Sequence, residues 1–326
     1  MSRLLATAIV AAAAVGSVSG QSSMPSISHE YAEVNAQRLH YVRVGRGPLM
    51  IFVHGFPEFW YEWKSQLAEF GRDHTAVALD QRGYNLSSKP EEVSAYQMPN
   101  LVADLHALAT ELLKSTGGKT FTLVGHDWGG VVAWVYAASH PDMLDRLVIL
   151  NAPHPTIFGR ELRANAAQQK ASEYMLMFRS AEAEALLSEN QYEWLKRAVL
   201  GNNPSAADVD AYVDAWSQPG ALTGGLNYYR AAGVGPPAPS ASTGRADAPP
   251  PTAAPPAIPP IVVRVPTLVI WGEKDTALLT GNLNGLEEVV PKLTVKRIPN
   301  GTHWIPRENA SDVNKLIREF LAQPGS

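Results

Sequence analysis

The sequence predicts an α/β protein with a mostly parallel β-sheet flanked by helices on both faces. Short, continuous apolar runs recur along the chain, and amphipathic helical patterns lie between them. Continuous apolar runs are typical of strands that are buried on both faces, as in parallel sheets. The alternation then stops, and residues 153–232 have helical character without a convincing strand. This stretch predicts a helical insertion into the sheet-forming part of the chain.

The expected elements follow each other in the order that such a sheet requires. Residues 39–44 alternate between apolar and polar, which indicates a half-exposed strand. Apolar runs predict further strands at 49–53, 75–79, 121–124, 147–150, 268–271 and 293–298. Helical patterns fall between them at 58–70, 101–114, 131–139 and 313–321.

Length and composition fit one large globular domain and exclude several kinds of chemistry. The chain has 326 residues, of which 45% are hydrophobic, and this is enough for a packed core with a small insertion. Its net charge is −4 and it has no basic run, so nucleic acid is not an expected partner. The chain has no cysteine, which excludes disulfides, thiolate catalysis and cysteine-ligated metals.

The first 20 residues have the layout of a secretory signal peptide. Arg3 supplies the positive charge, residues 4–16 form an apolar run, and small residues follow. We therefore expect an exported protein, secreted or periplasmic, whose mature chain begins near Gln21. The apolar run is short for a membrane span, so we expect no stable membrane association; the alternative is an uncleaved anchor.

Beyond this segment the chain divides into four parts. Residues 24–152 form the first part of the core, and residues 153–232 form the helical insertion. Residues 233–262 are rich in proline and alanine and predict an extended linker. Residues 263–326 complete the core. Nothing in the sequence indicates the oligomeric state.

The most informative motif runs from Gly125 to Gly130 and places Asp127 between an expected strand and an expected helix. It has the form of a nucleophile elbow with an acidic residue at its apex. A carboxylate that attacks a saturated carbon forms an ester, which water can later cleave. The elbow thus indicates hydrolysis at an alkyl carbon, as in epoxides, alkyl halides or fluoroacids. Asp127 also suits a helix N-cap, which is compatible with this role.

Six further motifs accompany the elbow in a fixed order. They are His54-Gly55-Phe56-Pro57-Glu58, Asp80-Gln81-Arg82-Gly83-Tyr84, Asn151-Ala152-Pro153-His154-Pro155, Asn227-Tyr228-Tyr229-Arg230, Gly272-Glu273-Lys274-Asp275 and Gly301-Thr302-His303-Trp304. From about Glu30 to the C-terminus the chain resembles the α/β-hydrolase family and, within it, the epoxide hydrolases. The resemblance implies the α/β-hydrolase fold, with residues 153–232 as a helical cap, and catalysis without metal or cofactor.

The resemblance implies a catalytic triad that follows the family order of nucleophile, acid and histidine. His303 follows a late expected strand and is the implied base. Asp275 is the implied acid, which holds His303 in the correct tautomer. Glu273 is a rival for this role. The alternative acid position that some relatives use holds Asn151, which carries no charge.

An oxyanion hole is implied at the backbone N–H groups of Phe56 and Trp128. Trp128 directly follows the nucleophile, and Phe56 follows an earlier core strand. The Phe56–Pro57 bond is a candidate for the cis form. For His54 and Pro57, simple packing of a tight loop is an equally good interpretation.

Two tyrosines are implied as groups that activate an epoxide. Tyr229 matches the position at the end of the cap where epoxide hydrolases carry such a residue, and Tyr174 resembles the second site through a looser motif. A phenol that hydrogen-bonds the ring oxygen stabilises the developing alkoxide and donates a proton. Tyr174 also fits an ordinary helix aromatic, and Tyr228 is expected to pack against the core.

The sequence thus predicts an epoxide hydrolase that converts a small apolar epoxide to a vicinal diol through an ester on Asp127. One alternative is a haloalkane or haloacid dehalogenase with the same triad, in which Trp128 donates to the halide. Those enzymes usually have Asn or Glu in place of Phe56 and lack the Asn-x-Tyr-Arg motif. A second alternative is a non-catalytic secreted binding protein, against which the intact triad argues.

Overall fold

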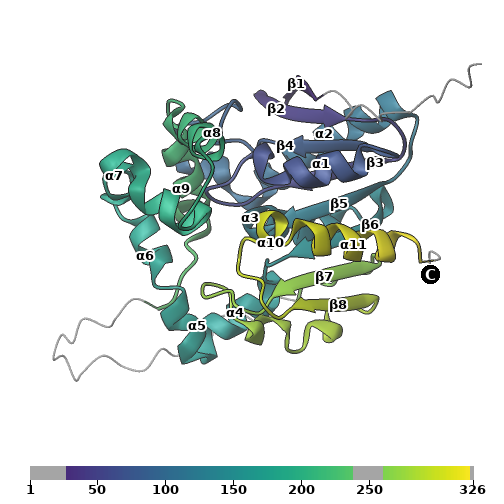
Figure 1. Ribbon diagram of the computed structural model, residues 1–326. Coiled ribbons are helices and arrows are strands. Elements are labelled where there is room, and N and C mark those ends of the chain that lie inside the picture. Colours follow the sequence, from purple (N-terminus) through teal and green to yellow (C-terminus); the bar gives the residue numbers. More distant parts are fainter. Residues whose placement is uncertain (1–26, 238–259, 324–326) are drawn as a thin grey trace, which may run out of the picture.

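The computed structural model describes residues 27–237 and 260–323 (Figure 1). The expected signal peptide at residues 1–20 lies outside the described residues, and so do residues 238–259 of the expected linker. No helix of the described part of the chain is long and apolar enough to span a membrane.

The described strands form one eight-stranded sheet in the order β1-β2-β4-β3-β5-β6-β7-β8. They are β1 (Ser28–Val34), β2 (Gln37–Val44), β3 (Leu49–Val53), β4 (Thr75–Leu79), β5 (Phe121–His126), β6 (Leu144–Leu150), β7 (Thr267–Gly272) and β8 (Leu293–Ile298). The six strands from β3 to β8 pair in parallel, whereas β1 and β2 join one edge in antiparallel fashion. The predicted mostly parallel sheet is therefore present.

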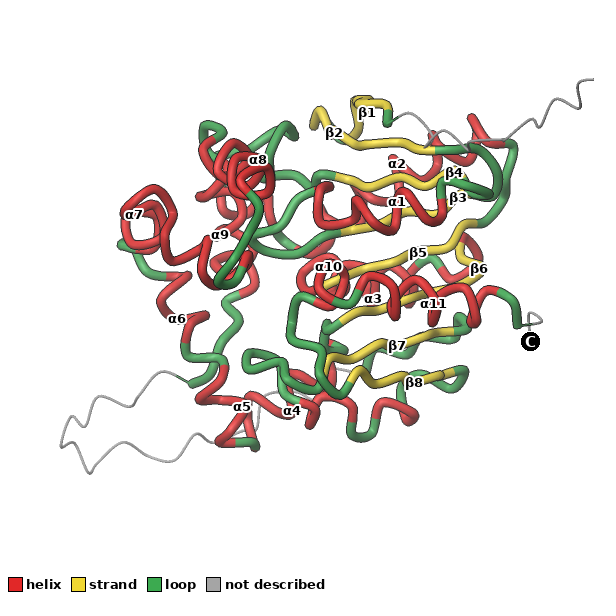
Figure 2. The backbone as a smooth tube through the Cα atoms, in the orientation of Figure 1, coloured by secondary structure: helices red, strands yellow, loops and turns green. Residues whose placement is uncertain are grey.

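Helices cover both faces of this sheet (Figure 2). They are α1 (Lys64–Phe70), α2 (Met98–Thr116), α3 (Asp127–Ser139), α10 (Ile305–Glu308) and α11 (Ala310–Leu321). Successive strand residues point to opposite faces, so Met50 and Phe52 pack with α1 and α11, while Ile51 and Val53 pack with α2 and α3. Each apolar run thus supplies two hydrophobic cores.

The insertion between β6 and β7 is helical in its described part. Its helices are α4 (Pro155–Ala164), α5 (Ala166–Ala171), α6 (Tyr174–Arg179), α7 (Ala183–Leu195), α8 (Ala206–Ser217) and α9 (Ala221–Ala232), with a π-helical turn η4 (Lys196–Leu200). Figure 1 shows α6 to α9 grouped at one end of the sheet. We refer to residues 155–232 as the cap.

Some elements differ from the sequence-based expectation. Strand β1 was not predicted, because Ala32 and Val34 are its only well-buried residues. The expected helix at 58–70 is a 3-10 turn, η1 (Trp60–Trp63), followed by α1. Helix α3 begins at Asp127, four residues before the expected start, because the elbow turns directly into the helix. Further 3-10 turns are η2 (Val93–Tyr96), η3 (Pro141–Met143), η5 (Thr280–Leu283) and η6 (Leu286–Glu288).

Candidate active site

The nucleophile elbow forms where β5 ends and α3 begins. Asp127 has φ +49°, a left-handed conformation that is unusual for residues other than glycine. The turn requires small neighbours: a Cβ on Gly125 would lie 2.6 Å from the Gly129 carbonyl oxygen, and one on Gly129 would lie 2.1 Å from that of Val53. Gly125 and Gly129 therefore allow the backbone segments to approach closely, and this places the Asp127 carboxylate beyond the end of β5.

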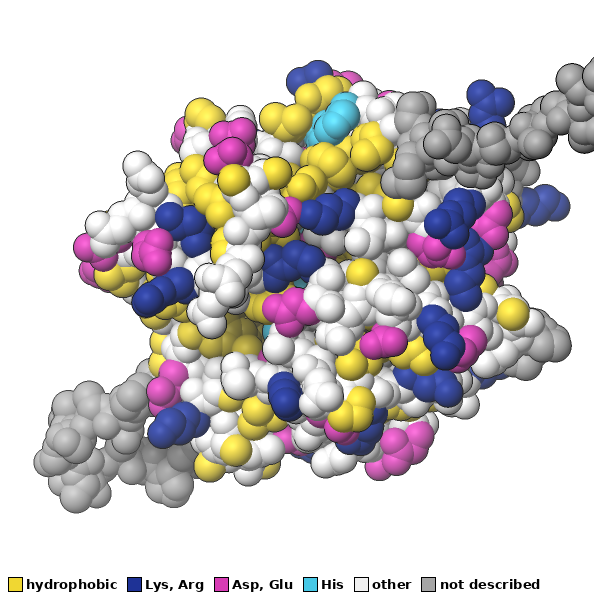
Figure 3. Space-filling model, in the orientation of Figure 1, with side chains coloured by type: hydrophobic (Ala, Val, Ile, Leu, Met, Phe, Trp, Pro, Cys, Tyr) yellow, Lys and Arg dark blue, Asp and Glu magenta, His cyan; other side chains and the backbone are white. Residues whose placement is uncertain are grey.

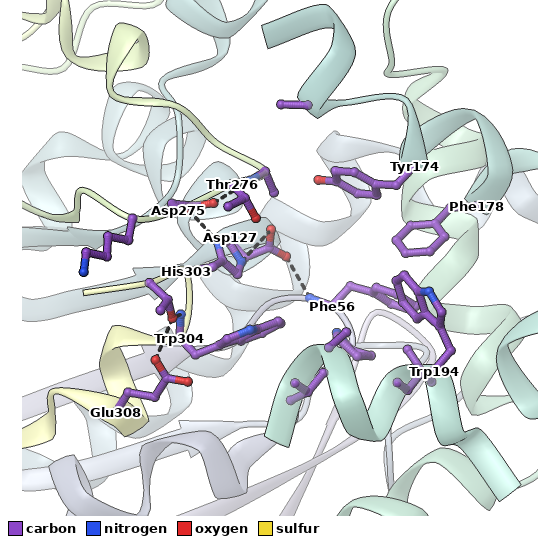
Figure 4. A pocket seen from close by; sticks show the side chains of 18 of the residues that line it. Phe56, Asp127, Tyr174, Phe178, Trp194, Asp275, Thr276, His303, Trp304 and Glu308 are labelled. Atoms are coloured by element: carbon purple, nitrogen blue, oxygen red, sulfur yellow. Dashed lines mark hydrogen bonds and ion pairs between the residues drawn. The ribbon is translucent and has the colours of Figure 1, made fainter. Parts of the chain in front are cut away.

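Three polar residues meet at the carboxyl ends of parallel strands in one half of the sheet. Asp127 follows β5, Asp275 follows β7 and His303 follows β8, so the sheet brings them together. Nδ1 of His303 lies 2.7 Å from Oδ2 of Asp275, and Nε2 of His303 lies 3.6 Å from Oδ2 of Asp127 (Figure 4). The structure thus brings together the three residues that the sequence singled out as nucleophile, base and orienting acid.

Asp275 is held as a buried carboxylate. Besides the His303 ring, it accepts hydrogen bonds from the backbone N–H groups of Ala277 at 2.8 Å and Leu278 at 2.9 Å. Burial on its own raises the pKa of Asp275, but the charge of His303 and these hydrogen bonds outweigh it, and the net pKa is lowered. The acid is thus ionised and fixed in one orientation.

His303 lies between two carboxylates. Burial lowers its pKa, but the charge of Asp275, the hydrogen bond to it and the charge of Asp127 raise the pKa of His303 to about 9 overall. The imidazole of the free protein therefore carries a proton at neutral pH.

The rival acid Glu273 lies elsewhere. Its carboxylate pairs with Arg297 at 3.0 Å and is partly exposed. Asn151, considered in the sequence only as an uncharged residue at the alternative acid position, donates from Nδ2 to Asp275 Oδ2 at 2.8 Å. Its Oδ1 accepts from the Gly272 N–H at 2.8 Å. Asn151 therefore ties the acid to the end of β7, a role that sequence reasoning missed.

The first of the two expected oxyanion-hole donors contacts Asp127. The backbone N–H of Phe56 donates to Oδ1 of Asp127 at 2.8 Å, and the Phe56–Pro57 bond is cis, as expected. Trp128 is the second residue of α3, where backbone N–H groups have no partner within the helix. Its role as the second donor stays a prediction.

His54 belongs to the packing of this loop. Its Nδ1 pairs with the Gly55 carbonyl oxygen at 2.8 Å, and its Nε2 accepts from the Gln81 N–H at 3.2 Å. Burial lowers the pKa of His54 to about 4, so the ring is neutral. This arrangement agrees with the loop-packing interpretation.

The two candidate tyrosines line one cavity with Asp127. Tyr229 comes from α9 and is buried, and Tyr174 is the first residue of α6. The rings of the two tyrosines lie 6.4 Å apart, and Figure 4 shows the Tyr174 hydroxyl pointing into the cavity. Burial, followed by the charge of Asp127, raises the pKa of both phenols well above its ordinary value. Both hydroxyls are therefore protonated and able to donate.

The rest of the Asn227-Tyr228-Tyr229-Arg230 motif is structural. Arg230 forms a two-pronged pair with Glu184, at 2.6 and 2.7 Å, which ties α9 to α7. The Tyr228 hydroxyl donates to the Arg82 carbonyl oxygen at 2.9 Å, in agreement with the expected packing role. The Glu184 contact was not predicted, because the sequence gives no sign of which cap residues meet.

The cavity has a volume of about 500 Å³ and lies between the cap and the strand ends. Its aromatic side chains are those of Phe56, Tyr174, Phe178, Trp194, Tyr229 and Trp304. Lys274, Thr276 and Glu308 add polar groups. Such a wall favours an apolar ligand with a reactive polar centre near Asp127.

No group of three or more His, Cys, Asp or Glu side chains in residues 27–237 and 260–323 is placed to hold a metal ion. On the face in Figure 3, Lys and Arg side chains are interspersed with Asp and Glu, so this face presents no broad basic patch for nucleic acid.

The chain belongs to the family described as alpha/beta hydrolase fold, whose model matches residues 48–310. Among curated relatives, epoxide hydrolase 3 of Xenopus tropicalis is 35% identical over 300 residues, which cover 88% of this chain and 75% of the relative. Human epoxide hydrolase 4 is 33% identical over 320 residues, covering 92% of this chain and 81% of the relative.

Solved structures of epoxide hydrolases are similar to this chain as well. The epoxide hydrolase of Bacillus megaterium in complex with an inhibitor has a TM-score of 0.78 and 35% identity, over 90% of this chain and all of that one. Epoxide hydrolase VrEH1 of Vigna radiata has a TM-score of 0.71 and 28% identity, over 90% of this chain and 97% of that one. The likeness therefore includes the helices of the cap as well as the sheet.

Proposed function

We propose that this protein hydrolyses epoxides to vicinal diols through a covalent ester on Asp127. The observation that carries the proposal is the environment of the Asp127 carboxylate. One oxygen accepts from the Phe56 N–H and the other faces His303, while two protonated phenols line the same cavity. The epoxide hydrolases among the relatives support the same reaction.

In the first step, Oδ2 of Asp127 attacks one carbon of the epoxide and the carbon–oxygen bond of the ring breaks. The leaving oxygen gains negative charge and takes a proton from the Tyr229 or Tyr174 hydroxyl. Oδ1 stays bound to the Phe56 N–H and becomes the carbonyl oxygen of the ester.

In the second step, water cleaves the ester. Ester formation removes the negative charge of Asp127, which is one of the charges that raise the pKa of His303. The imidazole then loses its proton more readily, and this proton restores the tyrosine hydroxyl that was deprotonated in the first step. The neutral imidazole acts as the base that takes a proton from water. Water attacks the ester carbonyl, the Phe56 N–H stabilises the oxyanion, and the protonated His303 gives its proton to the leaving diol oxygen. The proton left on the Asp127 carboxyl group passes back to His303, which restores the free enzyme.

The dehalogenase alternative requires the Trp128 indole to face the halide. Trp128 is buried, with its ring edge-on to Tyr229 at 5.1 Å, and it hydrogen-bonds the Tyr229 hydroxyl. Its side chain therefore supports the cap tyrosine. This contact favours an enzyme that acts on an oxygen leaving group.

A product assay tests the function directly. The purified protein is incubated with small aryl and alkyl epoxides and, separately, with matched alkyl halides. We expect diol from the epoxides and little halide from the others. Halide without diol would establish the dehalogenase reaction, and neither product would support a binding protein.

We further propose that the protein is exported after cleavage near Gln21. The support is the sequence of residues 1–20 alone. Intact-mass measurement of the mature protein tests this, and a mature chain that retains Met1 would contradict it.

A further inference from the structure

A second buried pair of an acid and an imidazole lies beside the triad, and the steps above do not use it. Glu62 comes from η1, and His126 is the last residue of β5, next to Asp127. Their side chains are 1% and 0% exposed, and Oε1 of Glu62 lies 2.5 Å from Nδ1 of His126. Neither atom forms a regular hydrogen bond with any described residue.

The other nitrogen of His126 fixes which tautomer is present. Nε2 lies 2.9 Å from the backbone carbonyl oxygen of His303, and the two imidazole rings lie 4.7 Å apart. A carbonyl oxygen only accepts, so Nε2 must carry a hydrogen. Burial and the charge of His303 lower the pKa of His126 to about 4, so the ring is neutral and Nδ1 holds a lone pair.

A lone pair and a carboxylate oxygen at 2.5 Å would repel each other unless a proton lay between them. Glu62 is the group that supplies it. Burial raises the pKa of Glu62 well above its ordinary value, and Asp127 raises it too, against the opposing charges of His303 and Arg307. The raised pKa favours a neutral Glu62, which can donate its O–H to Nδ1 of His126.

The remaining charged groups near Glu62 are engaged elsewhere. The Tyr212 hydroxyl, from α8, donates to Oε2 of Glu58 at 2.5 Å, and burial raises the pKa of Glu58 to about 8. The Arg307 guanidinium, from α10, donates to the carbonyl oxygen of Val199. The proton of Glu62 thus has His126 as its acceptor.

We propose that Glu62 and His126 are positioning residues for the catalytic base. The proton of Glu62 fixes the tautomer of His126, and His126 then holds the backbone carbonyl of His303. The loop that carries His303 is thereby anchored to the end of β5, so the imidazole keeps its position opposite Asp127. This inference rests on the proposed function, because it assigns His303 the role of base.

A comparison of the rates of the two reaction steps distinguishes a positioning role from a general loss of stability. His303 acts only when water cleaves the ester, so a loosened His303 loop slows that step and leaves ester formation nearly unchanged. Glu62→Leu removes the donor and Glu62→Gln keeps one, since an amide N–H can donate to Nδ1. Glu69→Gln, at a partly exposed carboxylate of α1, is the matched control.

Single-turnover kinetics on a small aryl epoxide measures both steps. We expect Glu62→Leu to slow ester hydrolysis roughly tenfold, because it leaves a buried acceptor unpaired, and to change ester formation less than about twofold. Glu62→Gln and Glu69→Gln should behave as wild type. Equal losses in both steps, or a Gln variant as slow as the Leu variant, would overturn the proposal.

NMR spectroscopy tests the contact between Glu62 and His126 in the absence of substrate. In protein labelled with ¹⁵N-histidine, the His126 resonances, assigned by their loss in His126→Gln, should show Nε2 protonated and Nδ1 as a strong acceptor. Glu62→Leu should shift the Nδ1 resonance towards that of a free lone pair. A protonated Nδ1 in the wild type would refute the tautomer assignment, whereas a wild type that makes no diol would refute only the proposed function.

Discussion

The backbone N–H of Phe56 donates a hydrogen bond to Oδ1 of Asp127 at 2.8 Å, so one carboxylate oxygen is already bound at the oxyanion site. The other oxygen, Oδ2, lies 3.6 Å from Nε2 of His303. The two oxygens are therefore not equivalent: Oδ2 is placed to attack and Oδ1 to become the ester carbonyl. This asymmetry makes the proposed mechanism open to isotope tests.

A single turnover in ¹⁸O-labelled water should give a first diol without label. Oδ2 of Asp127 becomes the oxygen that bonds to the substrate, and water then attacks the ester carbonyl, so the label enters Asp127. Mass spectrometry of the diol and of the peptide that contains Asp127 measures both. Label in the first diol would mean that water attacks the epoxide directly.

His303→Gln extends this test to the second step. Glutamine cannot take a proton from water, so ester hydrolysis should fall by roughly 10²–10⁴ while ester formation continues. The intact mass of the protein should then increase by the mass of the substrate. A variant that loses both steps equally would contradict the assignment of His303 as base for the ester.

Asp275→Asn should reduce ester hydrolysis by about 10³–10⁴, because the amide no longer favours the tautomer that His303 needs. Glu273→Gln should leave the rate near that of wild type, because the Glu273 carboxylate pairs with Arg297 at 3.0 Å and lies away from His303. Steady-state diol formation compares the two variants. A large loss in Glu273→Gln alone would make Glu273 the acid.

The raised pKa of His303 predicts how stability depends on pH. The pKa in the folded protein is about 9 against an ordinary value of 6.5. Protonated His303 therefore stabilises the fold fully below pH 6.5, and this contribution is lost as the pH rises from 6.5 through 9.

Asp127→Asn provides the control for this prediction. The substitution removes a negative charge that raises the pKa of His303, so the imidazole should titrate at a lower pH than in wild type. NMR titration of His303 and urea unfolding between pH 6 and 10 measure the two effects. The same His303 pKa in both proteins would show that Asp127 does not interact with the imidazole.

The sequence predicted the buried strands, and the structure brings together the three residues that it proposed as a triad. Apolar runs such as residues 49–53 are fully buried in β3, and the strand order places the ends of β5, β7 and β8 together. Asp127 could thus be chosen from its motif after a strand, whereas the resemblance to the family implied Asp275 and His303. Strand β1 escaped prediction because most of its residues are polar or exposed, so that only Ala32 and Val34 are buried in the core beside its pairing with β2.

The contacts that support the site were not predictable in the same way. Glu62 stands in a run of aromatic residues, and a lone carboxylate there is expected at the surface. It meets His126 across 64 positions of the chain only because η1 packs against the end of β5. Asn151 and Glu184 likewise act through partners that folding brings near. Local pattern identifies the reacting groups, whereas their supports depend on tertiary packing.

The last prediction concerns the two cap tyrosines. An epoxide oxygen gains negative charge in the transition state, and a hydroxyl aimed at it acts most strongly at that stage. Tyr229→Phe should lower epoxide turnover by roughly 10²–10³, and Tyr174→Phe should lower it by the same factor or less if both phenols share the charge. Both losses should lie in ester formation, which pre-steady-state kinetics resolves.

Tyr228→Phe is the matched control, because it removes a neighbouring phenol that donates to the Arg82 carbonyl oxygen, 2.9 Å away. This variant should lose about 1 kcal/mol of unfolding free energy and keep its turnover. A halide leaves without a proton, so a dehalogenase would depend far less on either cap hydroxyl. Near-full epoxide turnover in Tyr229→Phe would therefore contradict the role of Tyr229 as proton donor. It would favour the dehalogenase alternative.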